Sequence, residues 1–387
     1  MGNLILNSLE IRNFRGFQHL TIEHLGRVNL IVGKNNIGKS SLLEALQLYA
    51  RKGVPDVIWN ILSARDENRQ SLSSRTTSIE DLLSSLKYLF YGRKEILKRQ
   101  LDPILIAPID PLSYSLTITI GWYATRVDED GNRKMQLLEP KEYDLVDNPT
   151  PRFTLQLDNQ QKISFPLRLD PLGSSRLLES ELKEIYSVFV SANGLDRDNE
   201  QDAILWDGVA LTSLEDEVLH ALRIIAPGVE GLNFLGDIQS VRLGMRRGIS
   251  SSRSRIPIPT IKIADIDDPL PLRSLGDGMQ RMLGIILALV NAKDGIVLID
   301  EIENGIHYSA QKELWQLIFQ LAHRLNIQVF ATTHSWDCIE GFQKAATENT
   351  DEKGMLIRLS LLGDDVIATL FDERKLGIAT REDIEVR

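Results

Sequence analysis

Residues 33–41 read GKNNIGKSS and combine glycines with a lysine and neighbouring serines. Gly33 and Gly38 permit backbone angles and close approaches that a side chain would block. Such a turn points several backbone N–H groups, and the positive end of the following helix dipole, at one place. Lys39 can then reach the β- and γ-phosphates of a nucleotide, and the Ser40 hydroxyl can ligate Mg²⁺. The stretch therefore predicts a site for a nucleoside triphosphate, taken as ATP with Mg²⁺. The residues expected to contact ATP are Gly33, Asn35, Asn36, Ile37, Gly38, Lys39, Ser40 and Ser41.

The patterns on either side of this loop support that interpretation. Residues 28–32 read VNLIV and predict a buried strand, and residues 41–48 read SLLEALQL and predict the first turns of a helix. A phosphate-binding turn needs the helix, because its N-terminus supplies the N–H groups. The competing interpretation, a glycine-rich loop that binds no ligand, is disfavoured by this strand-before and helix-after context.

A pair of acids, Asp300 and Glu301, follows the apolar run 296–299. Hydrolysis of ATP needs a metal ligand and a group that positions water, in addition to a phosphate loop. Asp300 is predicted to hold Mg²⁺ through water, together with Ser40. Glu301 is predicted to orient or deprotonate the attacking water. The simpler alternative is that both acids only end a strand and meet solvent.

Two further segments carry groups that suit phosphate. Residues 274–280 read SLGDGMQ and open a predicted helix, so the Ser274 hydroxyl and the glycine N–H groups could form a second anion site. Taken alone, this segment is equally an ordinary helix cap. His334 follows the predicted strand 329–333 and could donate to the γ-phosphate, although a histidine after a strand can also be purely structural.

The composition limits the class of protein. The chain has 387 residues, a formal charge of −10, 43% hydrophobic and 25% charged residues. Such a charge argues against nucleic acid covering the whole surface, while local basic patches remain compatible with it. Cys338 is the single cysteine, which excludes an intrachain disulfide and suits a reducing cytoplasm. No targeting segment is recognised near the start, and the longest apolar run, 285–290, is too short to cross a membrane. A cytoplasmic protein is predicted.

The elements that must position these residues alternate between strand and helix at both ends of the chain. The middle is expected to hold polar helices, then antiparallel strands with one wet face, because apolar residues there recur at period two. A capping box is expected at 212–215, ahead of a helix that ends by Pro227. The expected strands are 4–11, 20–22, 27–33, 113–123, 153–157, 163–167, 296–300, 329–333, 355–359 and 365–370. The expected helices are 41–48, 81–90, 177–192, 278–292 and 314–325, with turns at 13–17, 128–132 and 363–364, a loop at 196–202 and a short last helix.

In order and spacing these motifs resemble the ABC-type ATPase heads of the SMC, RecF and OLD (overcoming-lysogenization-defect) proteins. The resemblance is closest to the OLD-like AAA-15/AAA-21 ATPases of prokaryotes. LEIRNFRG at 9–16 matches the opening strand and turn, and GKNNIGKSSLLEAL matches Walker A. SLGDGMQR at 274–281 matches the signature motif, IVLIDEIENGIH at 296–307 matches Walker B with the D-loop, and FATTHS at 330–335 matches the switch-histidine motif.

The resemblance implies an α/β fold, namely a P-loop NTPase head of ABC type with an antiparallel β lobe and a helical insertion. The implied domains are an N-terminal ATPase lobe (1–57), an insertion or arm region (58–265) and a C-terminal ATPase lobe (266–387). Two heads would clasp two ATP molecules head to tail, giving a homodimer or a higher even oligomer. Each site would take Lys39, Glu301 and His334 from one subunit, with the segment 303–307 along the seam. The other subunit would contribute Ser274, Gly276 and Asp277. A Mg²⁺-sensing glutamine is expected between Walker A and the signature, at a position that the sequence leaves open.

The resemblance also suggests partners. Full-length OLD proteins carry a Toprim nuclease domain after the ATPase, and the segment after His334 is too short for one. A nuclease or other effector is therefore expected as a separate polypeptide, as in phage-defence operons. An arginine cluster free of acids could bind the phosphates of DNA or RNA, although it could also be a solvated loop or hold an acidic protein. The cluster consists of Arg242, Arg246, Arg247, Arg253 and Arg255.

Two other functions stay open at this point. One is a RecF-like DNA-repair ATPase without a dedicated effector. The other is a scaffold that binds ATP as a structural component and does not turn it over. Intact Lys39, Asp300 and Glu301 argue against the scaffold.

Overall fold

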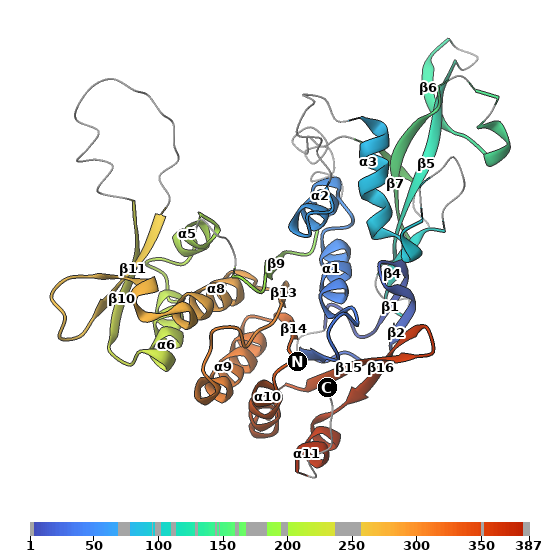
Figure 1. Ribbon diagram of the computed structural model, residues 1–387. Coiled ribbons are helices and arrows are strands. Elements are labelled where there is room, and N and C mark those ends of the chain that lie inside the picture. The colour runs from blue at the N-terminus through green and yellow to red at the C-terminus, as the bar shows by residue number, and fades with distance from the viewer. Residues whose placement is uncertain are drawn as a thin grey trace, which may run out of the picture.

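The computed structural model places a six-stranded sheet at the centre of the molecule, with helices on both faces (Figure 1). The strand order is β16-β15-β3-β14-β13-β9, in which every neighbouring pair is parallel except β15 with β16. The strands are β3 (Val28–Val32), β9 (Ser187–Val190), β13 (Ile296–Ile299), β14 (Gln328–Thr332), β15 (Gly354–Leu362) and β16 (Asp365–Phe371). The structure describes residues 4–68, 78–94, 96, 102–109, 114–127, 131–143, 145–146, 148–158, 162–167, 184–194, 200–236, 257–349 and 352–381.

The inner strands are unbroken apolar runs because both faces of the sheet are covered. On one face, Ile31, Leu298 and Phe330 pack against α1 (Lys39–Ala50). On the other face, Leu30 and Val297 join a core formed with three helices. These are α8 (Asp277–Asn291), α9 (Gln311–Arg324) and α10 (Trp336–Glu348). The parallel strands therefore bring their carboxyl ends, with the predicted chemical groups, to one edge between two layers of helix.

An antiparallel lobe rises from one side of the central sheet, and a smaller unit flanks the other side (Figure 1). The antiparallel sheet has the order β2-β1-β4-β5-β7-β8, with β6 also paired to β5. Its strands are β1 (Leu9–Phe14), β2 (Phe17–Ile22), β4 (Ile104–Ala107), β5 (Leu116–Val127), β6 (Arg133–Leu137), β7 (Thr150–Leu157) and β8 (Ile163–Pro166), and α2 (Pro55–Ala64) and α3 (Ile79–Leu86) lie beside them. The smaller unit contains α5 (Glu200–Asp207), α6 (Glu215–Ile225) and the strands β10 (Val229–Gly236), β11 (Pro257–Ile263) and β12 (Leu270–Pro271).

The fold class is confirmed, since a mixed α/β head with an antiparallel lobe is what the structure contains. The last strands form the predicted hairpin, which turns at Gly363-Asp364, and α11 (Glu373–Arg381) follows it. The predicted domain limits stay predictions. β9, from the middle segment, pairs with β13 in the central sheet. Across the described residues, no helix is both long and apolar enough to cross a membrane.

Some local predictions were wrong. Part of the segment 177–192, predicted as a helix, is strand β9, because Val188 and Val190 bury alternate side chains beside β13. The loop predicted at 196–202 is helical from Glu200 onward, where α5 begins. The capping box at 212–215 does not form. Glu215 accepts the N–H of Leu211, and the Thr212 hydroxyl accepts that of Leu214.

Several predictions fall wholly or partly outside the described residues, among them parts of the segments 177–192 and 196–202. The arginine cluster (Arg242, Arg246, Arg247, Arg253 and Arg255) lies there entirely, and most of the predicted turn at 128–132 does too. Both remain predictions.

Candidate nucleotide site

The phosphate loop connects β3 to α1, as predicted, and close packing accounts for its glycines. Gly33 has φ 144°, and a Cβ on it would lie 2.6 Å from the carbonyl oxygen of Leu359. Gly38 has φ 109°, and a Cβ there would lie 2.8 Å from the ring of Phe17. Gly38 also caps α1 without any side-chain hydrogen bond. The first N–H groups of α1 are therefore open to an anion, which the helix dipole favours.

The Lys39 side chain lies over this loop. Its Nζ donates to the carbonyl oxygen of Gly33 at 2.8 Å and to that of Lys34 at 3.2 Å. Burial lowers the pKa of the Lys39 ammonium, while the carboxylates of Asp300 and Glu301 act to raise it. The ammonium is thus held within the loop and close to both acids, where phosphate oxygens would replace the backbone carbonyls as acceptors.

The predicted metal ligands, Ser40 and Asp300, meet in the structure. Ser40 Oγ donates to Asp300 Oδ1 at 3.1 Å, and Thr332 Oγ1 donates to the same oxygen at 2.6 Å. Among the described residues there is no cluster of three or more His, Cys, Asp or Glu side chains that could hold a metal ion. This donor set fits Mg²⁺, which is bound through one or two protein oxygens plus substrate phosphates and water.

Glu301 is fixed through its backbone and its side chain. Its φ is 48°, an uncommon left-handed conformation for a residue with a side chain. Its N–H donates to Thr332 Oγ1 at 2.8 Å, and its carbonyl accepts from Arg281 at 3.0 Å. Its carboxylate oxygen Oε2 accepts from Asn304 Nδ2 at 2.7 Å. These contacts fix both the backbone and the carboxylate of Glu301.

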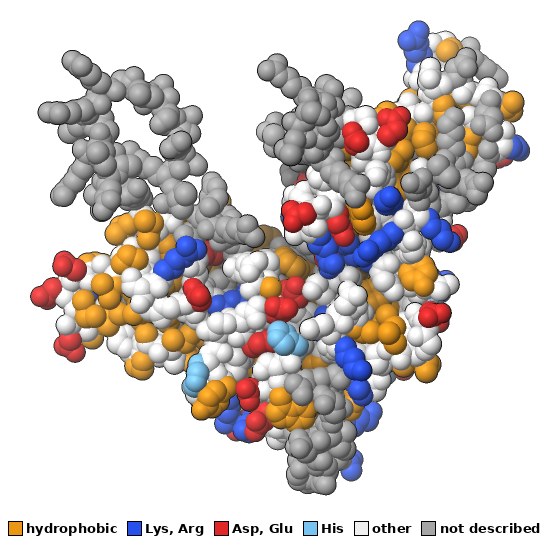
Figure 2. All heavy atoms as spheres, in the orientation of Figure 1, with side chains coloured by type: hydrophobic (Ala, Val, Ile, Leu, Met, Phe, Trp, Pro, Cys, Tyr) orange, Lys and Arg blue, Asp and Glu red, His pale blue; other side chains and the backbone are white. Residues whose placement is uncertain are grey.

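These groups surround one cleft of about 450 Å³, hereafter the nucleotide cleft. The phosphate loop, from Asn35 to Ser41, lines it together with Asp300 and Glu301. Figure 2 shows Lys and Arg side chains gathered where the antiparallel lobe meets the central sheet. The remaining lining residues are Arg15, Gly16, Arg65, Arg93, Leu361, Asp364 and Val366.

A buried ion-pair network forms the basic wall of the nucleotide cleft. Arg15, whose side chain is 4% exposed, pairs with Glu44 at 2.5 Å and with Glu67 at 2.9 Å. Arg65 pairs with the other Glu44 oxygen at 2.6 Å. Burial raises the pKa of Glu44, while both arginines act to lower it. The network ties the β1–β2 turn to α1 and to the end of α2, so it fixes the wall opposite the acids.

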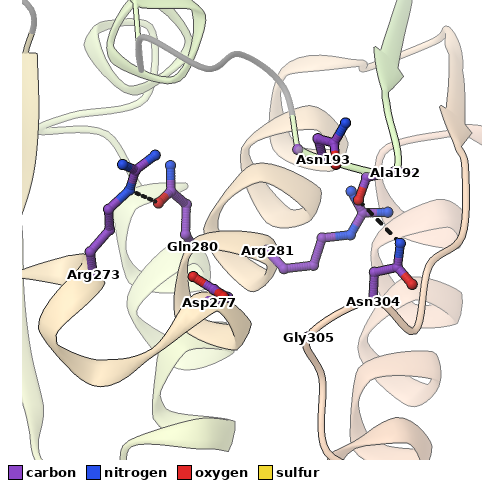
Figure 3. A pocket seen from close by; sticks show the side chains of 9 residues that line it. Ala192, Asn193, Arg273, Asp277, Gln280, Arg281, Asn304 and Gly305 are labelled. Carbon is purple, nitrogen blue, oxygen red and sulfur yellow. Dashed lines mark hydrogen bonds between the residues drawn. The ribbon is translucent and has the colours of Figure 1, made fainter.

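The signature turn, residues 274–277, lies outside the nucleotide cleft. Ser274, Gly276 and Asp277 are exposed, and no atom lies within 4 Å of a Cβ placed on Gly276. Gly276 caps α8 without a side-chain hydrogen bond, and the backbone of Gly305 packs against Gly278 in the first turn of that helix. Asp277 lines a second cleft of about 370 Å³ with Arg273 and residues of the D-loop (Figure 3).

His334 contacts the D-loop. Its ring is 52% exposed, and Nδ1 lies 3.2 Å from Glu303 Oε1. The backbone N–H of His334 donates to the same oxygen at 3.0 Å. His334 is not among the described residues that line the nucleotide cleft. Its role toward the γ-phosphate therefore remains a prediction. Such a role requires either that the His334 side chain moves or that a second copy of the chain binds beside it.

Sequence reasoning missed residues that hold the acids in place. Arg281 is 5% exposed and donates to the backbone carbonyls of Ser191, Asp300 and Glu301, which joins α8 to both the acid pair and β9. Burial lowers the pKa of Arg281 to about 10. Asn304 bridges Glu301 and the carbonyl of Ala192, as Figure 3 shows for the latter. Arg281 lies in the segment 274–281 and Asn304 in the segment 296–307, and their places in these two motifs were the only sequence feature that pointed to them.

The expected Mg²⁺-sensing glutamine is not among the residues directly after β9. β9 is the neighbour of β13, so the residues after β9 lie at the edge that carries Asp300. The sequence there is Ser191-Ala192-Asn193, without glutamine. Asn193 lines the second cleft. The position of the expected glutamine therefore remains open.

Asn304→Asp is expected to lower kcat by about tenfold or more, because a second carboxylate would repel Glu301 where the amide now donates a hydrogen bond to it. Asn304→Ala removes the same hydrogen bond and should also lower kcat. Both rates are measured by phosphate release at saturating ATP. A parent rate for both variants would show that Asn304 does not position Glu301.

Comparisons with known proteins agree with this site. Residues 5–105 match a family model described as "AAA ATPase domain", and residues 236–337 match one described as "AAA domain, putative AbiEii toxin, Type IV TA system". An "ATP/GTP phosphatase" of Helicobacter pylori is 24% identical over 361 residues, which are 87% of each chain. The RecF replication and repair protein of Clostridioides difficile is 44% identical over 45 residues, 12% of each chain.

A solved SMC head bound to the C-terminal winged-helix domain of ScpA aligns with 95% of this chain and 97% of its own, at 12% identity and a TM-score of 0.46. The segments matched by the two family models contain the phosphate loop and the acid pair respectively. Two segments of the chain are thus similar to AAA_15 and AAA_21 ATPase domains.

Proposed function

We propose that this ATPase is a switch in which two copies close over two ATP molecules and separate after hydrolysis. One observation carries the proposal. The signature turn is exposed and lies outside the nucleotide cleft of its own chain. An exposed helix N-terminus that has no side-chain cap and is preceded by a serine can attract an anion. A second copy of the chain could bring this site to the γ-phosphate that its twin holds.

The residues of the chain divide the chemistry between them. The N–H groups at the start of α1 and the Lys39 ammonium hold the β- and γ-phosphate oxygens, and Mg²⁺, when bound beside Ser40 and Asp300, adds positive charge there. Glu301 accepts a proton from, or orients, the water that attacks the γ-phosphate. Asn304 and Arg281 keep the Glu301 carboxylate and backbone in position for that step.

The association of subunits tests this proposal. Glu301→Gln should retain ATP and therefore accumulate the closed dimer. Light scattering after size-exclusion chromatography should give twice the chain mass with ATP and Mg²⁺, and the mass of one chain with ADP or without nucleotide. A mass that is the same under all three conditions would contradict an ATP-driven switch.

We further propose that the switch controls a separately encoded nuclease or other effector in prokaryotic anti-phage defence. The description of one matching family model supports this, because it refers to an AbiEii toxin of a type IV toxin–antitoxin system. A tagged chain co-expressed with the product of its neighbouring gene should retain that product with ATP. Failure to retain it, with ATP or with ADP, would remove the effector from the proposal and leave the ATPase cycle intact.

A further inference from the structure

The nucleotide cleft continues past the phosphate loop to the tip of the β15–β16 hairpin. Leu361, Asp364 and Val366 line it there. Leu361 is 63% exposed, and Val366 is buried beside it. Asp364 is exposed, and it receives no hydrogen bond and forms no ion pair within the described part of the chain. The proposed cycle of binding and hydrolysis gives these residues no role.

The hairpin and the catalytic acids flank the phosphate loop from opposite sides. β15 is paired with one edge of β3, whereas β14 and then β13 lie on the other edge. β15 and β3 are parallel, so the end of β15 lies at the same edge of the sheet as the phosphate loop. The two also touch, since Gly33 packs against the backbone of Leu359.

The direction of the reaction fixes the direction of the nucleotide. In phosphoryl transfer the attacking water and the leaving oxygen lie roughly in line across the γ-phosphate. With Glu301 holding the water, the β-phosphate and the nucleoside must extend away from Glu301. Across the loop from Glu301, the described lining of the cleft is the hairpin tip and the wall that carries Gly16.

Gly16 provides open space at that end. It lies in the β1–β2 turn, and β2 packs beside β16. No atom of the described residues lies within 4 Å of a Cβ placed on Gly16, and the Gly16 backbone is outside the left-handed region. The β1–β2 turn therefore leaves room beside Gly16, in the cleft that the hairpin tip also lines.

We propose that this end of the cleft binds the base, and that Asp364 reads its edge; this rests on the proposed function of the phosphate loop. Leu361 and Val366 provide an apolar surface for a purine ring. The Asp364 carboxylate can only accept hydrogen bonds, so it selects bases that carry N–H donors. Guanine offers two adjacent donors, N1–H and N2–H, which match a carboxylate bidentately, whereas adenine offers only its N6 amino group. The favoured substrates are purine nucleoside triphosphates, and Asp364 strengthens the binding of GTP more than the binding of ATP.

Equilibrium binding of GTP, ITP and ATP to chains that carry Glu301→Gln tests the inference without turnover. ITP keeps the N1–H donor of GTP and lacks the N2 amino group. Adding Asp364→Ala should weaken the binding of GTP by about 10- to 100-fold, that of ITP by less and that of ATP by only a few-fold. The reason is that the variant loses one charge-assisted hydrogen bond for each N–H donor that the base offers to the carboxylate. The matched control Asp365→Ala removes an exposed carboxylate that does not line the cleft, and should leave all three affinities unchanged.

A second variant tests the place of the base independently of charge. Gly16→Leu fills the open space and should weaken all three nucleotides alike. If Asp364→Ala leaves the ratio of GTP to ATP affinity at the parent value, the base is read elsewhere and the inference is overturned. If Glu301→Gln chains bind no triphosphate at all, the result contradicts the proposed function itself and not only the inference about the base. Lys39→Ala should abolish the binding of every nucleotide and serves as the no-binding control in the same assay.

Discussion

Glu301→Gln is expected to lower the steady-state rate of ATP hydrolysis by about 10²- to 10⁴-fold, the contribution typical of a general base. The amide cannot take a proton from water. The left-handed backbone of residue 301 and its bonds to Thr332 and Arg281 do not involve the carboxylate, so the site should otherwise persist. ATP binding should therefore be retained, which distinguishes a lost base from a lost fold. Phosphate release and nucleotide binding are measured on the same preparation.

The matched control for this prediction is Glu313→Gln. Glu313 is exposed in the first turn of α9 and lies outside both clefts. The Glu313→Gln variant should hydrolyse ATP at the parent rate. If Glu301→Gln also hydrolysed at the parent rate, Glu301 would not be the base.

Ser274→Glu is expected to lower hydrolysis by about 10²-fold or more, through an effect on the partner copy. A carboxylate on the exposed signature turn would face the γ-phosphate held by the second copy, and like charges that are desolvated together repel strongly. Binding of ATP to the single chain should be unchanged, because Ser274 does not line the nucleotide cleft. Turnover is measured as a function of protein concentration, since the parent should gain specific activity as chains associate.

Thr369→Glu is the control for Ser274→Glu. It adds the same charge to an exposed position of β16, and should leave turnover and its dependence on concentration as in the parent. Normal turnover by Ser274→Glu would mean that the signature turn does not reach a nucleotide.

The sequence predicted most of the central sheet and the phosphate end of the site, for a physical reason. Strands β3, β13 and β14 are buried on both faces and are therefore continuous apolar runs, which are easy to recognise. Gly33, Gly38, Lys39 and Ser40 lie within one loop of consecutive residues, so their geometry follows from local structure. The meeting of Ser40 with Asp300 followed from parallel strands that end at one edge.

Contacts between distant segments could not be predicted in the same way. β9 is a short edge strand that pairs with β13, and its apolar residues also suited the end of a helix. Arg281 had no visible role until α8 was packed against the acid pair. Asp364 was recognised only as part of a turn, because its place in the nucleotide cleft depends on the pairing of β15 with β3.

The most direct test of the account is a mixing experiment with two inactive variants. Lys39→Ala inactivates the phosphate loop and leaves the signature turn intact. Ser274→Glu inactivates the signature turn and leaves the phosphate loop intact. In a mixed dimer, one of the two composite sites contains an intact half from each chain. Equimolar mixing should therefore restore about a quarter of the parent rate, because half of the randomly formed two-fold dimers are mixed and each has one working site. No recovery, in a mixture shown to contain mixed dimers that bind ATP, would contradict a site shared between two copies.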